Sequence, residues 1–179
     1  MNFVKGIKTN LVEVSEVDSK SIIELRNNPS INRFLSSSKE ITIEQQVEWI
    51  KRNRLASDSY YFKITDSAGN FFGTISLYSL ESNQAEFGRF ISKNPIHAVE
   101  AEYLIIRFGF EILNLKRIYC RTVIENKTVW NQHYKFGFKD VQDVVLDQKS
   151  GFSLKVQEIT KEIYLNFDYS SILRLISRF

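Results

Sequence analysis

The sequence predicts an α+β protein, in which a mixed, mostly antiparallel sheet of about seven strands is flanked by about four helices. Two observations predict this class. Segments with strand-like alternation and segments with helical periodicity follow one another in the order β-α-α-β-β-β-α-β-α-β-β. The strand segments are also apolar enough to need cover on their faces, in a chain of which 43% of the residues are hydrophobic.

The N-terminal part predicts one strand and two helices. Residues 8–15 (KTNLVEVS) alternate as a strand does. Asp18 then caps a helix that Pro29 ends, because the residue before a proline disfavours the helical conformation. Thr42 and Gln45 have the spacing of a capping box, which predicts that an amphipathic helix follows.

Three strands in a meander are predicted next, at residues 60–65, 71–80 and 84–92. The segment between the first two, residues 66–70 (DSAGN), has the composition of a hairpin turn. From about residue 98 to residue 113, apolar residues recur at steps of three and four, which predicts a helix with one buried face.

The C-terminal part predicts further strands at 117–124, 138–146 and 153–166. Between the first two lies a helix that opens at Asn126 and ends at Gly137, because glycine readily adopts the left-handed conformation that ends helices. The tail, residues 168–179 (DYSSILRLISRF), is apolar on one side if helical. We expect it to pack on the core or on a second subunit, which leaves a homodimer open.

The composition argues against several classes of protein. The 24 Lys and Arg residues and 21 Asp and Glu residues give a net charge of only +3, spread along the chain, so we expect no nucleic-acid partner. A lone Cys120 excludes a disulfide scaffold, and with only His97 and His133 beside it no metal-ligand spacing exists. No apolar run approaches the ~18 residues that a membrane span requires. We expect a single cytoplasmic domain over residues 1–179, with no metal and no membrane partner.

Two polar residues share one face of the helix at 126–137. Seven positions separate Asn126 from His133, which is close to two turns at ~3.6 residues per turn. Two polar groups on an otherwise apolar stripe suggest a functional site.

The same segment carries a family resemblance. Asn126, His133 and the run Lys135-Phe136-Gly137-Phe138, after a long helix and a strand, resemble the signature of the GNAT superfamily of acetyl-CoA-dependent N-acetyltransferases. The resemblance covers nearly the whole chain and implies a three-layer fold. Leu25-Arg26-Asn27, residues 44–50 (EQQVEWI) and residues 86–91 (EFGRFI) are similar to the branch that acetylates amino sugars on nucleotide carriers. The related branch that acetylates protein N-termini, including those of ribosomal proteins, shares much of this pattern.

The resemblance implies acetyl-CoA as the acetyl donor, with its pyrophosphate at the loop before the long helix. In the family this loop is rich in glycine, which lets backbone N–H groups approach the phosphates. Here the loop is Lys93-Asn94-Pro95-Ile96-His97-Ala98, with an isoleucine in place of a glycine and a proline that has no N–H. The predicted cofactor contacts are Ile91, Lys93, Asn94, Ile96, His97, Ala98 and Asn126. The alternative for Asn126 is a simple N-cap.

The resemblance also implies direct acetyl transfer and assigns the catalytic residues. Glu86 takes the proton of the amine through water, and His133 protonates the departing thiolate. The alternatives are a solvated strand residue for Glu86 and a helix-capping histidine for His133. Tyr134 is a substitute for His133, although a step of one residue turns ~100° around the helix.

Arg26, Asn27 and Tyr78 are the predicted substrate-binding residues, with the serine loop at 36–38 beside them. An arginine fork suits a diphosphate or a carboxylate, although Arg26 at a helix end also suits the helix dipole and Tyr78 also suits the core. The leading hypothesis is an N-acetyltransferase for an amino sugar attached to a nucleotide. The alternatives are a protein N-terminal acetyltransferase and, because the glycine loop is degraded, a non-catalytic binding module.

Overall fold

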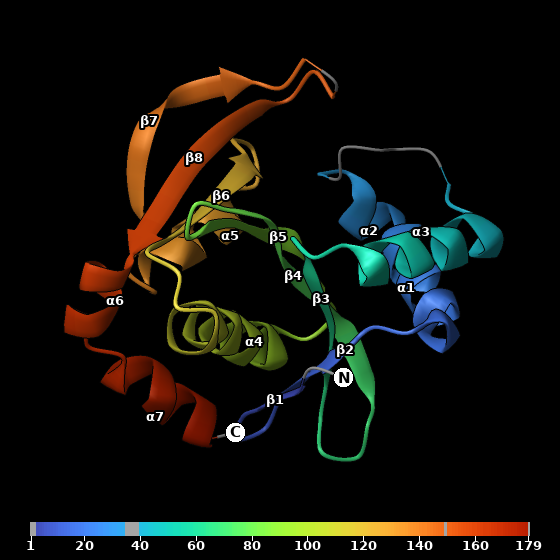
Figure 1. Cartoon of the computed structure of the whole chain (residues 1–179), viewed down its shortest axis with the longest axis horizontal. Helices are drawn as coiled ribbons and strands as arrows, with labels where there is room; N and C mark the ends of the chain where they lie inside the picture. The colour runs from blue at the N-terminus through green and yellow to red at the C-terminus, as the bar shows by residue number, and fades with distance from the viewer. Residues whose placement is uncertain (1–2, 35–39, 149, 179) are drawn as a thin grey trace.

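The computed structural model describes residues 3–34, 40–148 and 150–178, and these form one eight-stranded sheet with helices on both faces (Figure 1). The strands are β1 (Phe3–Lys5), β2 (Asn10–Glu13), β3 (Tyr60–Thr65), β4 (Phe71–Glu81), β5 (Gln84–Ser92), β6 (Arg117–Val123), β7 (Lys139–Leu146) and β8 (Ser153–Thr160). Their order in the sheet is β1-β2-β3-β4-β5-β6-β8-β7.

Nine helical segments lie between and after these strands in the described residues. They are η1 (Glu16–Asp18), α1 (Ser19–Arg26), α2 (Pro29–Asn32), α3 (Ile43–Leu55), α4 (Pro95–Arg107), the π-helix η2 (Phe108–Ile112), α5 (Lys127–Tyr134), α6 (Lys161–Asn166) and α7 (Ser170–Arg178). None of the helices in these described ranges is long and apolar enough to cross a membrane.

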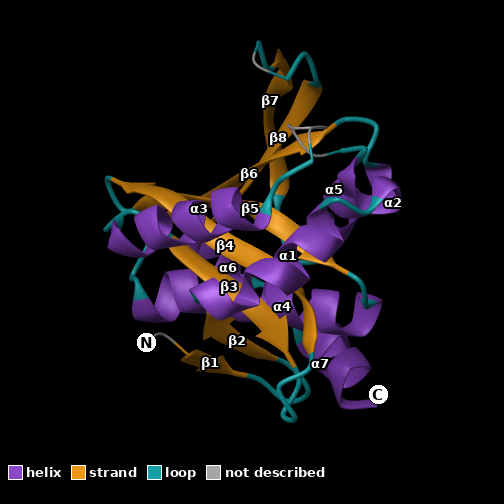
Figure 2. Cartoon of the chain, turned by 90° about the vertical axis from the view of Figure 1, so that its right-hand side faces the viewer, coloured by secondary structure: helices purple, strands orange, loops and turns teal. Residues whose placement is uncertain are grey.

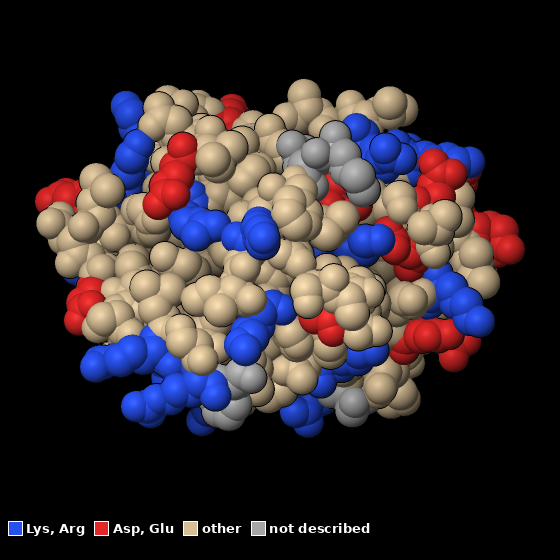
Figure 3. Space-filling model, turned by 90° about the horizontal axis from the view of Figure 1, so that it is seen from below, with Lys and Arg blue, Asp and Glu red and all other residues tan. Residues whose placement is uncertain are grey.

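The sheet separates two groups of helices, which gives the three layers that the resemblance implies. Helices α1 and α3 lie over one face, in front of the sheet in Figure 2, and enclose a small core of Val14, Ile22, Ile50 and Tyr61. Helices α4 and α7 pack on the other face over the main core, which includes Ile105 and Ile176. The face of the molecule in Figure 3 carries both basic and acidic side chains. The absence of a nucleic-acid partner stays a prediction.

The pairing of β5 with β6 is the feature that positions the site. All neighbouring strands are antiparallel except these two, which run parallel and pair only at 84–86 with 117–119. Beyond these three pairs the strands diverge, so residues 87–92 and 120–123 have no partner strand on their facing sides. Buried backbone N–H and C=O groups need hydrogen-bond partners, so this gap in the sheet is suited to a ligand with amide groups.

Local chemistry explains several elements as predicted. The Thr42 hydroxyl accepts from the Gln45 N–H at 3.3 Å and the Gln45 side chain accepts from the Thr42 N–H at 3.0 Å, which confirms the capping box. The Asp66 carboxylate accepts from the Ala68 and Asn70 N–H groups at 2.9 Å and closes the β3–β4 hairpin. Gly137 has φ +92°, the left-handed conformation predicted at the end of α5.

Three differences between the sequence predictions and the structure go beyond the bounds of an element. The structure has an eighth strand, β1, which pairs with β2 as a hairpin. The sequence did not predict it, because three residues are too few to show alternation. The strand predicted at 153–166 ends at Thr160, whose hydroxyl accepts from the Ile163 N–H and starts α6. Pro29 does not merely end α1, which stops at Arg26. It is the first residue of α2, where its missing N–H costs nothing.

The predicted tail helix is α7. It buries Ile172 and Ile176 against the main core, whereas Leu175 on its other side is 45% exposed. Packing of the tail on its own core is therefore confirmed for these described residues.

Candidate active site

A cavity of about 440 Å³ fills the gap between the diverging strands. Its walls are β5 residues 87–92, β6 residues 120–123, one face of α5, and residues of the α2 region. The wall includes Asn126, the N-cap of α5, and His133 within the helix, so the two polar groups predicted to share a face do so.

A bulge in β5 shapes one wall. Ser76 pairs with Gly88 and Thr74 with Ile91, so two residues of β5 lie opposite one of β4, and Arg89 adopts φ 48°. The Arg89 guanidinium donates to Asn53 Oδ1 and Ser59 Oγ, both at 3.0 Å. These contacts hold the arginine on the α3 side of the sheet.

Glu86 is buried and accepts three hydrogen bonds. The Tyr78 hydroxyl donates to its Oε1 at 2.8 Å, and Arg121 donates from Nε to Oε1 at 3.0 Å and from Nη2 to Oε2 at 2.6 Å. Glu86 is 4% exposed, which excludes the alternative of a solvated strand residue. Its carboxylate is not among the groups that line the cavity. Arg121 lies between the Glu86 carboxylate and the cavity, and the Arg121 side chain is 50% exposed.

The same cluster explains the position of Tyr78. Burial and then the Glu86 carboxylate raise the pKa of Tyr78 above its usual range, so the hydroxyl stays protonated and donates. Tyr78 is therefore bonded to Glu86 and does not line the cavity, although it was predicted as a substrate contact.

His133 lies on the opposite face of the sheet from Arg121. Its ring is 2% exposed, its Nδ1 is 2.7 Å from Oε1 of the wholly buried Glu102 on α4, and its edge meets the rings of Phe87 and Phe138. Burial lowers the pKa of His133, but the Glu102 carboxylate and the Cys120 thiol outweigh burial and raise it to about 10. The ring is therefore an imidazolium at neutral pH.

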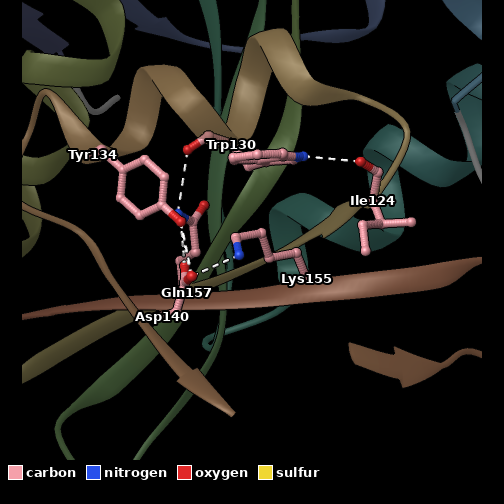
Figure 4. Close-up of polar contacts among 6 residues, drawn as sticks. All are labelled: Ile124, Trp130, Tyr134, Asp140, Lys155 and Gln157. Atoms are coloured by element: carbon pink, nitrogen blue, oxygen red, sulfur yellow. Dashed lines mark hydrogen bonds and ion pairs between the residues drawn. The ribbon is translucent and has the colours of Figure 1, made fainter. Parts of the chain in front are cut away.

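Helix α5 is fixed to the sheet by the contacts in Figure 4. The Trp130 indole N–H donates to the Ile124 carbonyl at 2.9 Å, and the Gln157 amide donates to the Trp130 carbonyl at 3.2 Å. The Tyr134 hydroxyl donates to Asp140 at 2.8 Å, and Tyr134 is not among the residues that line the cavity. Tyr134 therefore faces elsewhere, as the helical turn predicts, and does not substitute for His133.

Asn126 occupies the N-cap position of α5, but its side chain makes no capping hydrogen bond. The Asn126 side chain therefore does not act as a simple N-cap. The amide lines the cavity together with His133 and is available to a ligand.

The loop before α4 departs further from the expected phosphate cradle. The Asn94 side chain accepts from the Ile96 N–H at 2.9 Å and the His97 N–H at 3.2 Å, and the Ala98 N–H donates to the Asn94 carbonyl. The N–H groups predicted to approach a pyrophosphate are thus capped by the chain itself. Lys93 lines a separate cavity of about 500 Å³ beside α1.

His97 turns away from the gap. Its Nδ1 is 2.9 Å from the Thr9 hydroxyl, and its ring stacks on Phe72 at 3.8 Å. Of the predicted cofactor contacts, Ile91 and Asn126 line the gap, whereas the segment 93–98 does not.

The predicted acceptor residues near the end of α1 are not in the cavity wall. Asn27 binds both the N–H and the carbonyl of Ile41 at 3.2 Å and so ties α1 to the segment before α3. Arg26 does not line the gap. The serine loop at 36–38 lies outside the described residues.

Five site residues were missed from the sequence: Arg33, Arg89, Cys120 and Arg121 in the cavity wall, and Glu102 behind His133. A usable signal existed for two of them. Cys120 and Arg121 are adjacent in a strand, so they must point to opposite faces of the sheet. Glu102 gave no signal, because a carboxylate on a helix is ordinarily solvated.

Comparison with known proteins identifies the fold. The sequence profile described as the Acetyltransferase (GNAT) domain matches residues 8–139. The chain belongs to the GNAT acetyltransferase family. This confirms the resemblance seen in the sequence. The protein is an N-acetyltransferase. No curated protein matched the sequence.

Solved structures agree with this assignment. Apo FdhC, described as a nucleotide-linked sugar GNAT, has 27% identity and a TM-score of 0.80, with 98% of each chain covered. Spermidine N-acetyltransferase from Vibrio cholerae, solved with CoA and spermine, has 22% identity and a TM-score of 0.78, covering 89% of this chain and 99% of that one. A GNAT-family acetyltransferase from Bacillus anthracis has 16% identity and a TM-score of 0.77, covering 90% and 99%. The last two show the fold alone.

The GNAT fold binds acetyl-CoA, and the gap in this GNAT protein suits such a donor because its backbone groups lack partner strands. Within the ranges 3–34, 40–148 and 150–178, no three His, Cys, Asp or Glu side chains are grouped so as to hold a metal ion.

Proposed function

We propose that the protein transfers an acetyl group from acetyl-CoA to an amine on a small anionic molecule, most directly an amino sugar of a nucleotide-sugar. The observation that supports this acceptor is the charge of the cavity wall. Arg33, Arg89 and Arg121 line it, and none of the described lining residues is an aspartate or a glutamate.

The arginines favour an anion for a physical reason. A guanidinium presents a planar fork of donors that matches phosphate oxygens, whereas a polyamine in the same cavity meets like charge. Glu86 neutralises part of this charge, but only behind Arg121. Two of the arginines, Arg89 and Arg121, lie on the α3 side of the sheet, opposite His133. We propose that the acceptor enters from that side and the donor occupies the gap.

The donor is held by the gap itself. The backbone of 87–92 and 120–123 offers hydrogen bonds to the amides of the pantetheine arm, and the Asn126 side chain adds one polar contact. Lys93 and the start of α4 are the proposed pyrophosphate contacts. For the N–H groups of Ile96 and His97 to reach a phosphate, the Asn94 side chain must release them.

Glu86 is the proposed acceptor for the proton of the amine, through water. Arg121 and Tyr78 fix the carboxylate in place, and Oε2 accepts from a single described donor, so a carboxylate lone pair remains for water. His133, as an imidazolium, stabilises negative charge that develops on the sulfur of the donor.

The test is the release of free CoA with four acceptors: a nucleotide-linked amino sugar, the same sugar without the nucleotide, spermidine, and a peptide with a free N-terminus. We expect the nucleotide-linked sugar to have the highest kcat/KM, and removal of the nucleotide to lower it at least about tenfold. Arg33→Ala should lower kcat/KM for this acceptor. Arg174→Ala, the same change on the outer side of α7, should not. A preference for spermidine or for the peptide would refute the proposed acceptor.

The non-catalytic binding module, expected as an alternative because the loop lacks glycine, does not agree with the family assignment, since the protein is an N-acetyltransferase. The Asn94 cap bears instead on the affinity for the donor, because it occupies N–H groups that a phosphate needs. Calorimetric titration with acetyl-CoA measures this affinity: saturable binding at micromolar concentration supports the proposed donor site, whereas no binding at millimolar concentration refutes it.

A homodimer stays a prediction. The edge strand β7 exposes Val144 and Leu146, at 47% and 62%, which is unusual for a strand with no partner on its outer side. Light scattering coupled to size-exclusion chromatography gives the number of subunits directly.

A further inference from the structure

Cys120 lies at the point where the gap begins. Tyr119 is the last residue of β6 that pairs with β5, and Cys120 is the first that does not. Its side chain is 2% exposed but contributes to the cavity wall, together with His133. A thiol therefore lies at the closed end of the cavity that we assign to the thioester.

The thiol, the imidazole and a carboxylate form a chain of contacts. His133 bonds Glu102 through Nδ1 at 2.7 Å, and Cys120 lies with the same His133 in the wall of the cavity. An imidazolium is a donor at both nitrogens. Glu102 occupies Nδ1, so the second ring nitrogen remains for the Cys120 sulfur in the same wall, and in the proposal below the S–H of Cys120 donates into the cavity.

We propose that Cys120 is the acid that protonates the departing CoA thiolate, and that His133 and Glu102 are positioning residues for it. This rests on the proposed function, and it moves the acid role from His133 to the thiol in front of it.

The proposed step balances in protons and electrons. When the tetrahedral intermediate collapses, the carbon–sulfur bond breaks and its electron pair goes to the CoA sulfur. The S–H bond of Cys120 breaks, its proton joins the CoA sulfur, and the remaining thiolate faces the His133 imidazolium. The amine has lost its own proton to water at Glu86, and water returns a proton to Cys120. The products are the N-acetyl compound and CoA thiol.

A thiol is well matched to this task. The proton passes from one sulfur to another, so the bond that breaks and the bond that forms are of the same kind. An imidazolium held by a buried carboxylate gives up its proton less readily. Its fixed charge is better used to stabilise the thiolate that Cys120 leaves behind.

The first test asks whether the two sulfurs meet, without measuring turnover. Wild-type protein is incubated with CoA disulfide, and its intact mass is recorded. Cys120 is the only cysteine, so any mixed disulfide with CoA forms there. We expect a mass increase of one CoA, slowed by excess acetyl-CoA and absent in Cys120→Ala. Binding of CoA without this adduct would show that the thiol is out of reach and would overturn the proposal.

The second test separates acid catalysis from packing. Cys120→Ala should lower kcat about a hundredfold while calorimetric affinity for acetyl-CoA stays within a few-fold, and Cys120→Ser, which keeps a donor, should restore part of kcat. Ile118→Val is the matched control: it removes one heavy atom from the same buried face of β6, away from the cavity, and should leave kcat near wild type.

Three results would count against the acid role. An unchanged kcat in Cys120→Ala would refute it. Equal losses in Cys120→Ala and Ile118→Val would assign the effect to packing. An acetyl group found on Cys120 after incubation with acetyl-CoA alone would make the thiol a nucleophile instead. The proposed function fails separately, if none of the acceptors is acetylated even though the mixed disulfide forms.

Discussion

Replacing Glu102 with glutamine removes the carboxylate that keeps His133 charged, and its effect on stability can be worked from the structure. The pKa of His133 is about 10, against 6.5 for the free side chain. That interval, at about 1.4 kcal/mol for each pH unit, corresponds to roughly 5 kcal/mol for the whole surroundings of the ring, in which Glu102 and Cys120 together outweigh burial. Breaking a buried ion pair generally costs about 3 to 5 kcal/mol, which agrees.

The sign follows from the direction of the pKa change. A histidine with a raised pKa stabilises the folded state fully below pH 6.5, and this contribution is lost as pH rises through about 10. The free energy of unfolding of the wild type, from urea titrations, should therefore fall between these limits by more than that of Glu102→Gln. The difference between the two slopes isolates His133 from the other groups that titrate in this range.

Glu100→Gln is the matched control. Glu100 is another buried carboxylate on α4, but it accepts backbone N–H groups of Ile7 and Lys8 and does not face His133. This variant should be less stable than the wild type, yet keep the wild-type dependence between pH 6.5 and 10. If Glu102→Gln also keeps that dependence, the buried imidazolium does not exist and the electrostatic argument for the site is wrong.

Three further variants test the rest of the site. Glu86→Gln should lower kcat about a hundredfold and leave acetyl-CoA affinity unchanged by calorimetry, because the carboxylate acts on the acceptor; a tenfold loss of affinity would contradict this. Arg121→Lys should raise the acceptor KM about tenfold, because lysine lacks the bidentate fork, and an unaltered KM would remove Arg121 from recognition. Asn94→Ala should destabilise the protein by about 1 kcal/mol in urea unfolding and tighten acetyl-CoA binding, because the helix loses its own cap; weaker binding would show that Asn94 is a ligand.

The sequence predicted most of the fold because its signals are local. Strands 60–65 and 84–92 were placed with the observed bounds, and the Thr42 capping box fixed the start of α3. The sequence did not predict strand β1 or the change from β8 to α6 at Thr160. Each involves only two or three residues, which is too short for a periodic pattern.

The site was predicted less completely, for a related reason. Asn126 and His133 could be brought together from helical spacing alone, since both belong to one helix. The roles of Arg121, Glu86 and Glu102 depend on contacts between different strands and helices, which the sequence does not show. The phosphate loop shows the limit most directly: its composition indicated a loss of glycine, but not that Asn94 had taken over the exposed amides.

The short parallel ladder of β5 and β6 has a mechanical consequence. Only three residue pairs join the five strands on one side of the molecule to the three on the other. In the proposed function, a bound donor spans this gap and forms hydrogen bonds with both halves of the sheet. Amide hydrogens of β6 should therefore exchange with solvent more slowly in the complex, while those of the β2–β3 ladder, far from the gap, keep their rates.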